Sequence, residues 1–336
     1  MDEKIGVSVV CTVYNHAKYL RECLDGFVSQ KTNFLFEVIV HDDASTDSSA
    51  EIIREYAEKY PEIIKPIIQV ENQYSQGADI IKEFIVPVVR GEYVALCEGD
   101  DFWCDSSKLQ KQYNALQDHP ECFMCTNKVE RVCEDGRSQN FYYPAIKVKE
   151  GVLSSRNFLE TCRGHVFQTS SYFFCAEPWK TFRLNPPEFK QLSDVGDEPY
   201  LLFFGQLGAV YYIDQIMSKY RVGVPGSWSS RQDNLVDIEK ITSHHKCMIA
   251  CFKSYDRYTN YAYHDICIEK IAAHMTLPYA LEKKCREFFL PENRIYLKKR
   301  TFKSKVFILI ACVFPTVGQR LFMKKRAGWK RTRMSK

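Results

Sequence analysis

The chain has 336 residues, of which 45% are hydrophobic and 26% are charged, a composition typical of a globular rather than a disordered protein. This length accommodates one large domain, or one domain with an appendage. Residues 291–336 hold 14 Lys and Arg side chains and one acid, which leaves 32 basic and 41 acidic side chains in residues 1–290. A body of net charge −9 with an end of +13 indicates an anionic partner for that end.

The cysteines and the first residues bear on the compartment. Several of the 14 cysteines lie inside apolar runs, Cys11 and Cys97 among them, which is typical of reduced thiols in a cytosolic core. The acidic start MDEKIGVSVV runs directly into a strand-like segment and lacks the form of a secretory signal. Because no uncharged stretch reaches the roughly 18 residues that span a bilayer, we expect a cytoplasmic protein.

Strand-like and helix-like segments alternate along the first 120 residues. Apolar, β-branched runs predict strands at 5–13, 36–40, 63–71 and 91–99. Apolar positions at helical spacing predict helices at 17–30, 48–60, 78–89 and 106–120. Strands that alternate with helices predict an α/β fold with a mostly parallel sheet covered on both faces.

Polar residues directly follow three of these strands: Asn15, Asp42, Asp43, Asp100 and Asp101. In such sheets the ligand crevice lies beyond the carboxyl ends of the strands, so we expect these side chains at one edge. The first strand-to-helix turn, TVYNHAKYL, has no Gly-rich phosphate-binding pattern. We therefore expect carboxylates to hold Mg²⁺ or Mn²⁺ against a phosphate. For the pair Asp100 and Asp101 alone, a solvated turn is the alternative.

Three motifs in chain order, VSVVCTVYN, VIVHDDASTDSS and GEYVALCEGDD, resemble the amino-terminal half of family-2 glycosyltransferases. The resemblance implies the GT-A fold, a Rossmann-like mostly parallel sheet, and a nucleoside diphosphate sugar as donor, which we expect to be UDP-linked. It also implies transfer to a hydroxyl group with inversion. The three motifs together are specific for the family, whereas each alone is a weak signal.

The resemblance assigns nucleotide-sugar binding to residues at the strand ends: Thr12, Tyr14, Asn15, Asp43 and Asp100. It assigns the metal to Asp101, the second residue of the acidic motif that usually reads DxD. Because this copy reads EGDD, a register that begins at Glu98 and places Asp100 third stays open.

An acidic segment opens a helix-like apolar run at residues 193–208, SDVGDEPYLLFFGQLG. Acids favour the amino-terminal end of a helix, so capping explains them as well as catalysis does. Transfer with inversion needs a general base near the acceptor. The resemblance to the GD motif of the family assigns that base to Asp197, with Asp194 and Glu198 as alternatives.

Further residues are assigned by the same resemblance or by position. The segment YRVGVPGSW resembles a YR-x-n-G-x-W segment of the family and places Arg221 on the diphosphate and Trp228 on a sugar, although a buried Arg pair and a core Trp are alternatives. The segment HVFQTSSYFF predicts a strand with His165, Gln168 and Thr169 as acceptor contacts, although a structural histidine is the alternative. His244 and His245 are expected on a solvated helix face.

The basic end holds nine apolar residues, 306–314, between two basic clusters. This run is too short to span a bilayer and suits its interface. Lys and Arg near anionic headgroups contribute about 1 kcal/mol each. Nucleic acid is the competing partner for such charge. The apolar residues favour the inner face of the cell membrane and no nucleic acid; a helix that packs on the core is the alternative.

We therefore expect a GT-A domain over 1–230, with a nucleotide-sugar-binding half at 1–120 and an acceptor-binding half at 121–230. A helical extension at 231–290 and a membrane-associating tail at 291–336 follow. The expected function is a metal-dependent glycosyltransferase that acts on a glycan or lipid-linked glycan in surface polysaccharide synthesis. An inactive nucleotide-sugar-binding or membrane scaffold protein is one alternative. A nucleotidyltransferase is the other, although its Gly-rich, basic opening loop is poorly matched by HAKYLRE.

Overall fold

The computed structural model describes residues 4–162, 167–227 and 238–321. The chain forms two compact units, residues 1–186 with 203–224 and residues 187–202 with 225–336. The short segment 187–202 therefore groups with the later helices, a division that the hydropathy pattern did not indicate. The domain boundaries predicted at residues 120, 230 and 290 stay predictions.

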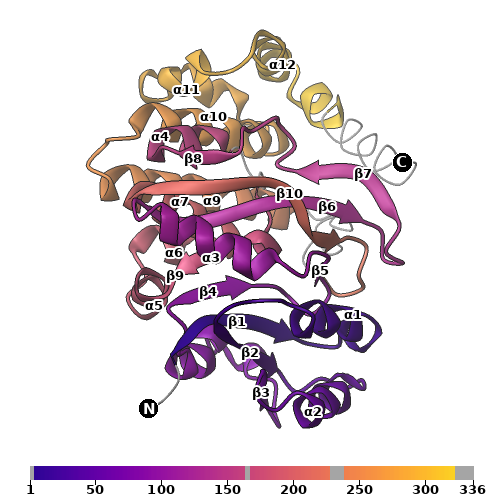
Figure 1. The fold of residues 1–336 in the computed structure, drawn as a ribbon. Helices are drawn as coiled ribbons and strands as arrows, with labels where there is room; N and C mark the ends of the chain where they lie inside the picture. The colour runs from indigo at the N-terminus through magenta and orange to yellow at the C-terminus, as the bar shows by residue number, and fades with distance from the viewer. Residues whose placement is uncertain (1–3, 163–166, 228–237, 322–336) are drawn as a thin grey trace. The chain divides into compact units, whose positions relative to one another are not determined.

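The first unit is built on a mixed β-sheet with the strand order β3–β2–β1–β4–β9–β6–β10–β5 (Figure 1). Its strands are β1 (Ile5–Val13), β2 (Leu35–Asp42), β3 (Ile64–Ile68), β4 (Tyr93–Leu96), β5 (Phe102–Trp103), β6 (Cys122–Val132), β7 (Ser138–Tyr143), β8 (Gly151–Leu153), β9 (Phe173–Cys175) and β10 (Ala209–Arg221). Strands β3, β2, β1 and β4 run parallel, as do β6 and β10. Strand β9 joins these two groups by antiparallel pairing with β4 and β6.

Helices of the first unit follow the strands that the sequence predicted. They are α1 (Ala17–Val28), α2 (Ser49–Lys59), α3 (Lys108–Asp118), α4 (Ser155–Thr161) and α5 (Ala176–Leu184). Helix α1 buries the apolar stripe that includes Leu20, Leu24 and Phe27, because these positions recur at helical spacing. Phe27 packs edge-on against Trp103 with ring centroids 4.7 Å apart. A Cβ atom at Gly26 would lie 2.7 Å from the Trp103 carbonyl oxygen, so glycine permits this close approach.

Two sequence predictions differ from the structure. The predicted helix at 78–89 is wrong as a regular α-helix: it is a π-helical turn, η2 (Ile81–Ile85), followed by a 3₁₀ turn, η3 (Val86–Val88). Pro87 lacks an N–H donor and its ring disfavours a regular helix at this point. The predicted strand at 165–174 is shorter, since a 3₁₀ turn, η4 (Thr169–Ser171), precedes β9.

The second unit is helical. It contains α6 (Glu188–Leu192), the first six residues of α7 (Asp197–Leu207), α9 (Ile238–Tyr258), α10 (His264–Leu281), α11 (Arg294–Lys298) and α12 (Phe302–Val313). Helices α9 and α10 pack against each other, and α6 packs against α9. Phe189 of α6 contacts the rings of Tyr255 and Tyr258 on α9 edge-on. The last five residues of α7 belong to the first unit.

Candidate functional site

The loops that follow β1, β2 and β4 meet at one edge of the sheet. The backbone N–H of Asp43 donates to the carbonyl of Val13 over 3.1 Å, and the N–H of Gly99 donates to the carbonyl of Thr12 over 3.0 Å. Thr12 therefore lies between the acidic loop after β2 and the acidic loop after β4. This is the edge of the sheet at which we expected a ligand crevice from the sequence.

Two polar residues of this edge hold the loops in place. Asn15 has a positive φ of 57°, its N–H donates to Ser45 Oγ over 2.8 Å, and its Oδ1 accepts the N–H of Thr46 over 2.7 Å. Asp42 is buried and accepts the N–H and the hydroxyl of Ser45. These bonds make the loop after β1 and the loop after β2 one connected surface.

Three residues on or beside these loops differ in how exposed they are: Thr12, Tyr14 and Asp43. Tyr14 is exposed and Thr12 is half-buried. Asp43 is buried, and its two carboxylate oxygens accept the backbone N–H groups of Gln73 and Tyr74 over 2.9 and 3.0 Å. The side chain of Tyr74 is itself exposed beside Asp43. No pattern in the sequence predicted that residues 73 and 74 bind the carboxylate of Asp43.

The acids of the motif after β4 differ in their surroundings. Glu98 is exposed, Asp100 is 8% exposed and Asp101 is 1% exposed. Asp101 Oδ1 accepts the backbone N–H of Arg221 over 2.8 Å, and its Oδ2 accepts Nε2 of Gln168 over 3.2 Å. Burial, with the charges of Asp100 and Glu98, raises the pKa of Asp101 well above its usual value. The metal role predicted for Asp101 stays a prediction, and these contacts favour the register of Glu98 and Asp100.

Arg221, the last residue of β10, is buried and turned into the protein. Its Nε donates to the carbonyl of Asp100 over 2.9 Å and its Nη1 to the carbonyl of Glu134 over 2.9 Å. Its Nη2 forms an ion pair with Glu22 at 2.6 Å, and its guanidinium lies 5.0 Å from the ring centroid of Tyr19. All three guanidinium nitrogen atoms of Arg221 thus have protein partners. The diphosphate contact predicted for Arg221 stays a prediction.

The acidic edge has few side chains that can bind a divalent cation. Within the ranges 4–162, 167–227 and 238–321, no cluster of three or more His, Cys, Asp or Glu side chains has a geometry for holding a metal ion. Mg²⁺ at phosphate sites takes one or two carboxylates, with substrate phosphate oxygens and water as its other ligands. In the register that begins at Glu98, the carboxylates of Glu98 and Asp100 would be the protein ligands of such an ion.

The predicted base, Asp197, opens α7 in the second unit. It is half-buried, and its Oδ1 accepts the N–H of Glu198 over 2.8 Å. Both alternatives have partners in the second unit: Glu198 forms an ion pair with Lys270 at 2.8 Å, and an oxygen of Asp194 lies 2.9 Å from Nδ1 of His244. The role of general base predicted for Asp197 stays a prediction.

Other sequence expectations have mixed outcomes. Trp228 and His165 lie outside the described residues. Gln168, expected at the acceptor, donates to Asp101 and accepts from the Ser170 backbone. The solvated face expected for His244 and its neighbour is wrong for His244, which is mostly buried against Asp194. No local signal in the sequence marked it, because its partner lies 50 residues away.

Comparison with known proteins places this geometry in context. Residues 8–173 match the model of a family described as Glycosyl transferase family 2. An uncharacterized protein of Mycobacterium tuberculosis is 42% identical over 158 residues, which are 46% of this chain and 45% of that protein. The chain thus matches about half the length of such curated relatives. A poly(ribitol-phosphate) beta-glucosyltransferase of Bacillus spizizenii is 34% identical over 109 residues, 32% of this chain and 17% of that protein.

A solved structure supports the fold. Staphylococcus aureus TarS 1-349 in complex with UDP-GlcNAc has a TM-score of 0.60 to this chain at 17% sequence identity. The likeness covers 94% of this chain and 90% of that chain. At this identity it shows the fold alone, and it confirms the predicted α/β architecture with a helical carboxyl-terminal region.

Proposed function

Because residues 8–173 match the model of glycosyl transferase family 2 and the chain has the GT-A fold, we propose that this protein transfers a sugar from a UDP-linked donor to a hydroxyl group of a glycan or lipid-linked glycan. The observation that carries the proposal is the meeting of Thr12, Asp43 and Asp100 at the carboxyl ends of β1, β2 and β4. The names of two compared proteins, a glucosyltransferase and a protein bound to UDP-GlcNAc, agree with a donor of this class.

Within the donor site, Thr12, Tyr14 and Asp43 contact the nucleoside. Glu98 and Asp100 would hold Mg²⁺ or Mn²⁺, and Asp101 keeps their loop in place through its bonds to Arg221 and Gln168. When bound, the cation neutralises charge on the departing diphosphate. Arg221 also stabilises this loop, because its Nε donates to the carbonyl of Asp100.

Asp197 is the general base. A carboxylate within hydrogen-bond reach of the acceptor hydroxyl removes its proton as the oxygen attacks the anomeric carbon, and the bond from that carbon to the diphosphate breaks in the same displacement. Attack from the side opposite the diphosphate inverts the anomeric configuration. With a glycan acceptor, the proposed role is in surface polysaccharide synthesis.

Donor hydrolysis tests this function without a known acceptor. We expect the wild-type protein to release UDP from UDP-GlcNAc or UDP-glucose in the presence of Mn²⁺, with water as acceptor. Asp197→Asn should lower this rate by at least about 100-fold and leave UDP binding, measured by calorimetry, unchanged. Wild-type turnover in Asp197→Asn would remove the base assignment.

Two outcomes would favour the other functions. A wild-type protein that binds a panel of UDP-sugars and releases no UDP from any of them is a binding or scaffold protein. Release of pyrophosphate from a nucleoside triphosphate identifies a nucleotidyltransferase.

The metal register has a separate test. A ligand that binds the folded state raises its stability, so UDP with Mn²⁺ should raise the Tm of the wild-type protein above the value with UDP alone. We expect Asp100→Asn to lose the Mn²⁺-dependent part of that increase and Asp101→Asn to retain it. The reverse pattern would return the metal role to Asp101.

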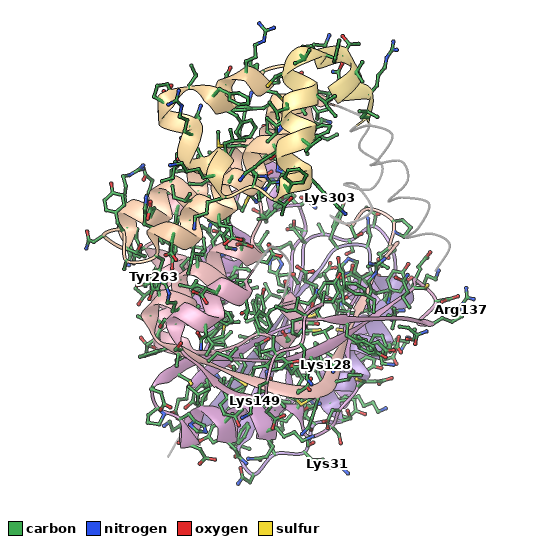
Figure 2. The ribbon with its side chains drawn as sticks, turned by 90° about the horizontal axis from the view of Figure 1, so that it is seen from above. Lys31, Lys128, Arg137, Lys149, Tyr263 and Lys303 are labelled. Atoms are coloured by element: carbon green, nitrogen blue, oxygen red, sulfur yellow. The ribbon has the colours of Figure 1, made fainter. Side chains whose placement is uncertain are left out.

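The carboxyl-terminal helix supports a peripheral membrane attachment. Helix α12 and the residues after it expose an apolar stripe in which Phe302, Leu309 and Val313 are 81%, 52% and 64% exposed. Lys303, labelled in Figure 2, is exposed near the start of the same helix. An exposed apolar stripe beside basic residues suits an anionic bilayer surface. In the part of the chain that the structure describes, no helix combines the length and apolar character for crossing a bilayer.

Liposome sedimentation tests this attachment. The full chain should pellet with vesicles that contain phosphatidylglycerol and stay in the supernatant with phosphatidylcholine alone. Deletion of residues 295–336 should abolish pelleting. Binding that survives the deletion would show that the tail is not the anchor.

A further inference from the structure

We propose that helices α9 and α10 position the catalytic base, with Lys270 and His244 as positioning residues for Asp197. The inference rests on the proposed function, since it gives Asp197 its role as base. It assigns to the helical unit a task in catalysis that neither the sequence nor the comparisons indicate.

The first contact lies directly after the base. Glu198 Oε1 accepts Nζ of Lys270, from α10, over 2.8 Å. The side chains of this pair are 6% and 9% exposed. Lys270 Nζ also lies 5.0 Å from the ring centroid of Phe252, on α9. A buried ion pair with this geometry holds the first turn of α7 firmly, because separating the two charges leaves each of them buried alone.

The second contact is made by Asp194, three residues before the base. Both carboxylate oxygens of Asp194 lie 2.9 Å from Nδ1 of His244, on α9. Ser193 Oγ lies 3.6 Å from the sulfur of Met248, one turn further along the same helix. The segment that leads into α7 is therefore tied to α9 on one side of Asp197, while Lys270 ties the other side to α10.

The two helices are joined to each other beside these contacts. His245, next to His244 on α9, has its Nδ1 2.9 Å from Nδ1 of His274 on α10. His274 lies one turn after Lys270 and packs against Phe252, with ring centroids 5.7 Å apart. Asp194 and Glu198, on either side of the base, are thus bonded to α9 and α10, and these two helices contact each other through His245 and His274.

A closed arrangement matters because the efficiency of a general base depends on its position. A base must lie within hydrogen-bond reach of the proton that it removes, and a misplacement of about 1 Å costs about 100-fold in rate. Asp197 opens its helix, and the preceding residues 193–196 are not helical. Contacts on both sides supply the restraint that this short segment lacks.

The charges near Asp197 allow an effect on the pKa of the base to be distinguished from an effect on folding stability. Titratable side chains of α9 and α10 near this segment include His244, His245, Cys247, Cys251, Lys270 and His274. Burial raises the pKa of both thiols, so they stay neutral at ordinary pH. Lys270 compensates the charge of Glu198. Without it, an unpaired carboxylate next to Asp197 would raise the pKa of the base.

The test compares kcat for UDP release from UDP-GlcNAc with Mn²⁺ across pH. We expect Lys270→Met to lower kcat at least about tenfold, to leave the donor KM unchanged, and to move the acid limb of the kcat profile up by about one pH unit. Lys270→Arg keeps the charge and should stay within about threefold of wild type with an unmoved limb. His244→Ala should lower kcat about tenfold at an unchanged donor KM.

Two further variants keep the test decisive. The double variant Glu198→Met/Lys270→Met buries no unpaired charge; it should lose kcat without a shifted limb, and it carries the test where Lys270→Met fails to fold. Lys246→Met removes an exposed ion pair between α9 and Glu282 and is the matched control, with wild-type kcat and limb expected. Wild-type kcat in the double variant and in His244→Ala would overturn the proposal. If Asp197→Asn itself retained wild-type turnover, the proposed base would fail instead.

Discussion

Two sites, one in each unit, bury charged side chains in opposite ways. In the second unit, Glu198 and Lys270 are buried as a pair 2.8 Å apart. In the first unit, Asp101 accepts hydrogen bonds from neutral donors. Lys108 is also fully buried there; its Nζ donates to the amide oxygen of Gln112 over 2.5 Å and lies 4.2 Å from the ring centroid of Trp103.

This difference separates two uses of buried charge. An acid and a base that face each other fix the relative position of the elements that carry them. A charged group buried among neutral ones shifts its pKa instead, and burial lowers the pKa of Lys108 to about 7. The second unit should therefore respond most to loss of one partner, and the first unit to pH.

Removal of one partner from the buried pair should have the largest effect. Lys270→Met should lower the free energy of unfolding by about 3–5 kcal/mol, because it leaves Glu198 buried without its counter-charge. Glu198→Met/Lys270→Met should recover most of that loss. Urea denaturation followed by circular dichroism measures both. Equal losses in the single and double variants would show that packing, not charge pairing, holds these helices.

The buried lysine of the first unit should give an intermediate, pH-dependent effect. Its folded-state pKa lies below its unfolded value, so above pH 7 the unfolded chain binds a proton that the folded protein does not. Stability of the wild type relative to Lys108→Met should therefore rise with pH, by about 1.4 kcal/mol per unit from about pH 7 to about pH 10. Urea unfolding at pH 6, 7, 8 and 9 tests this. Parallel pH curves for the two proteins would contradict it.

The ion pair of Arg221 should give the smallest effect. Its partner Glu22 has a side chain that is 53% exposed, so water screens and replaces the carboxylate. Glu22→Gln should change the free energy of unfolding by less than about 1 kcal/mol, since Arg221 keeps its bonds to the carbonyls of Asp100 and Glu134. A loss as large as that of Lys270→Met would remove the distinction between the two units.

Much of the first unit could be predicted from local pattern. The apolar runs at 5–13 and 36–40 became β1 and β2, and polar residues after them ended each strand at the sheet edge. The local sequence pattern did not show how the side chains of the adjacent acids are oriented. Which acid is buried depends on the backbone N–H of Arg221 and the amide of Gln168, and these lie 120 and 67 residues away from Asp101.

The grouping of residues 187–202 with the later helices was hidden for the same reason. Helix capping accounts for Asp197 and Glu198 within a window of a few residues. Their actual setting depends on Lys270, 72 residues along the chain from Glu198. Spacing within one segment carries no information about a partner on another helix, so the role of α10 emerges only in three dimensions.

The segregation of charge along the chain has a consequence for handling the protein. A body of net charge −9 and an end of +13 attract each other between molecules as well as within one. The Debye length is about 30 Å at 0.01 M salt and about 8 Å at 0.15 M, so dilute buffers should promote head-to-tail clustering and moderate salt should disperse it. Light scattering across a salt titration would report this colloidal behaviour, and the full-length chain should be purified and stored at the higher ionic strength.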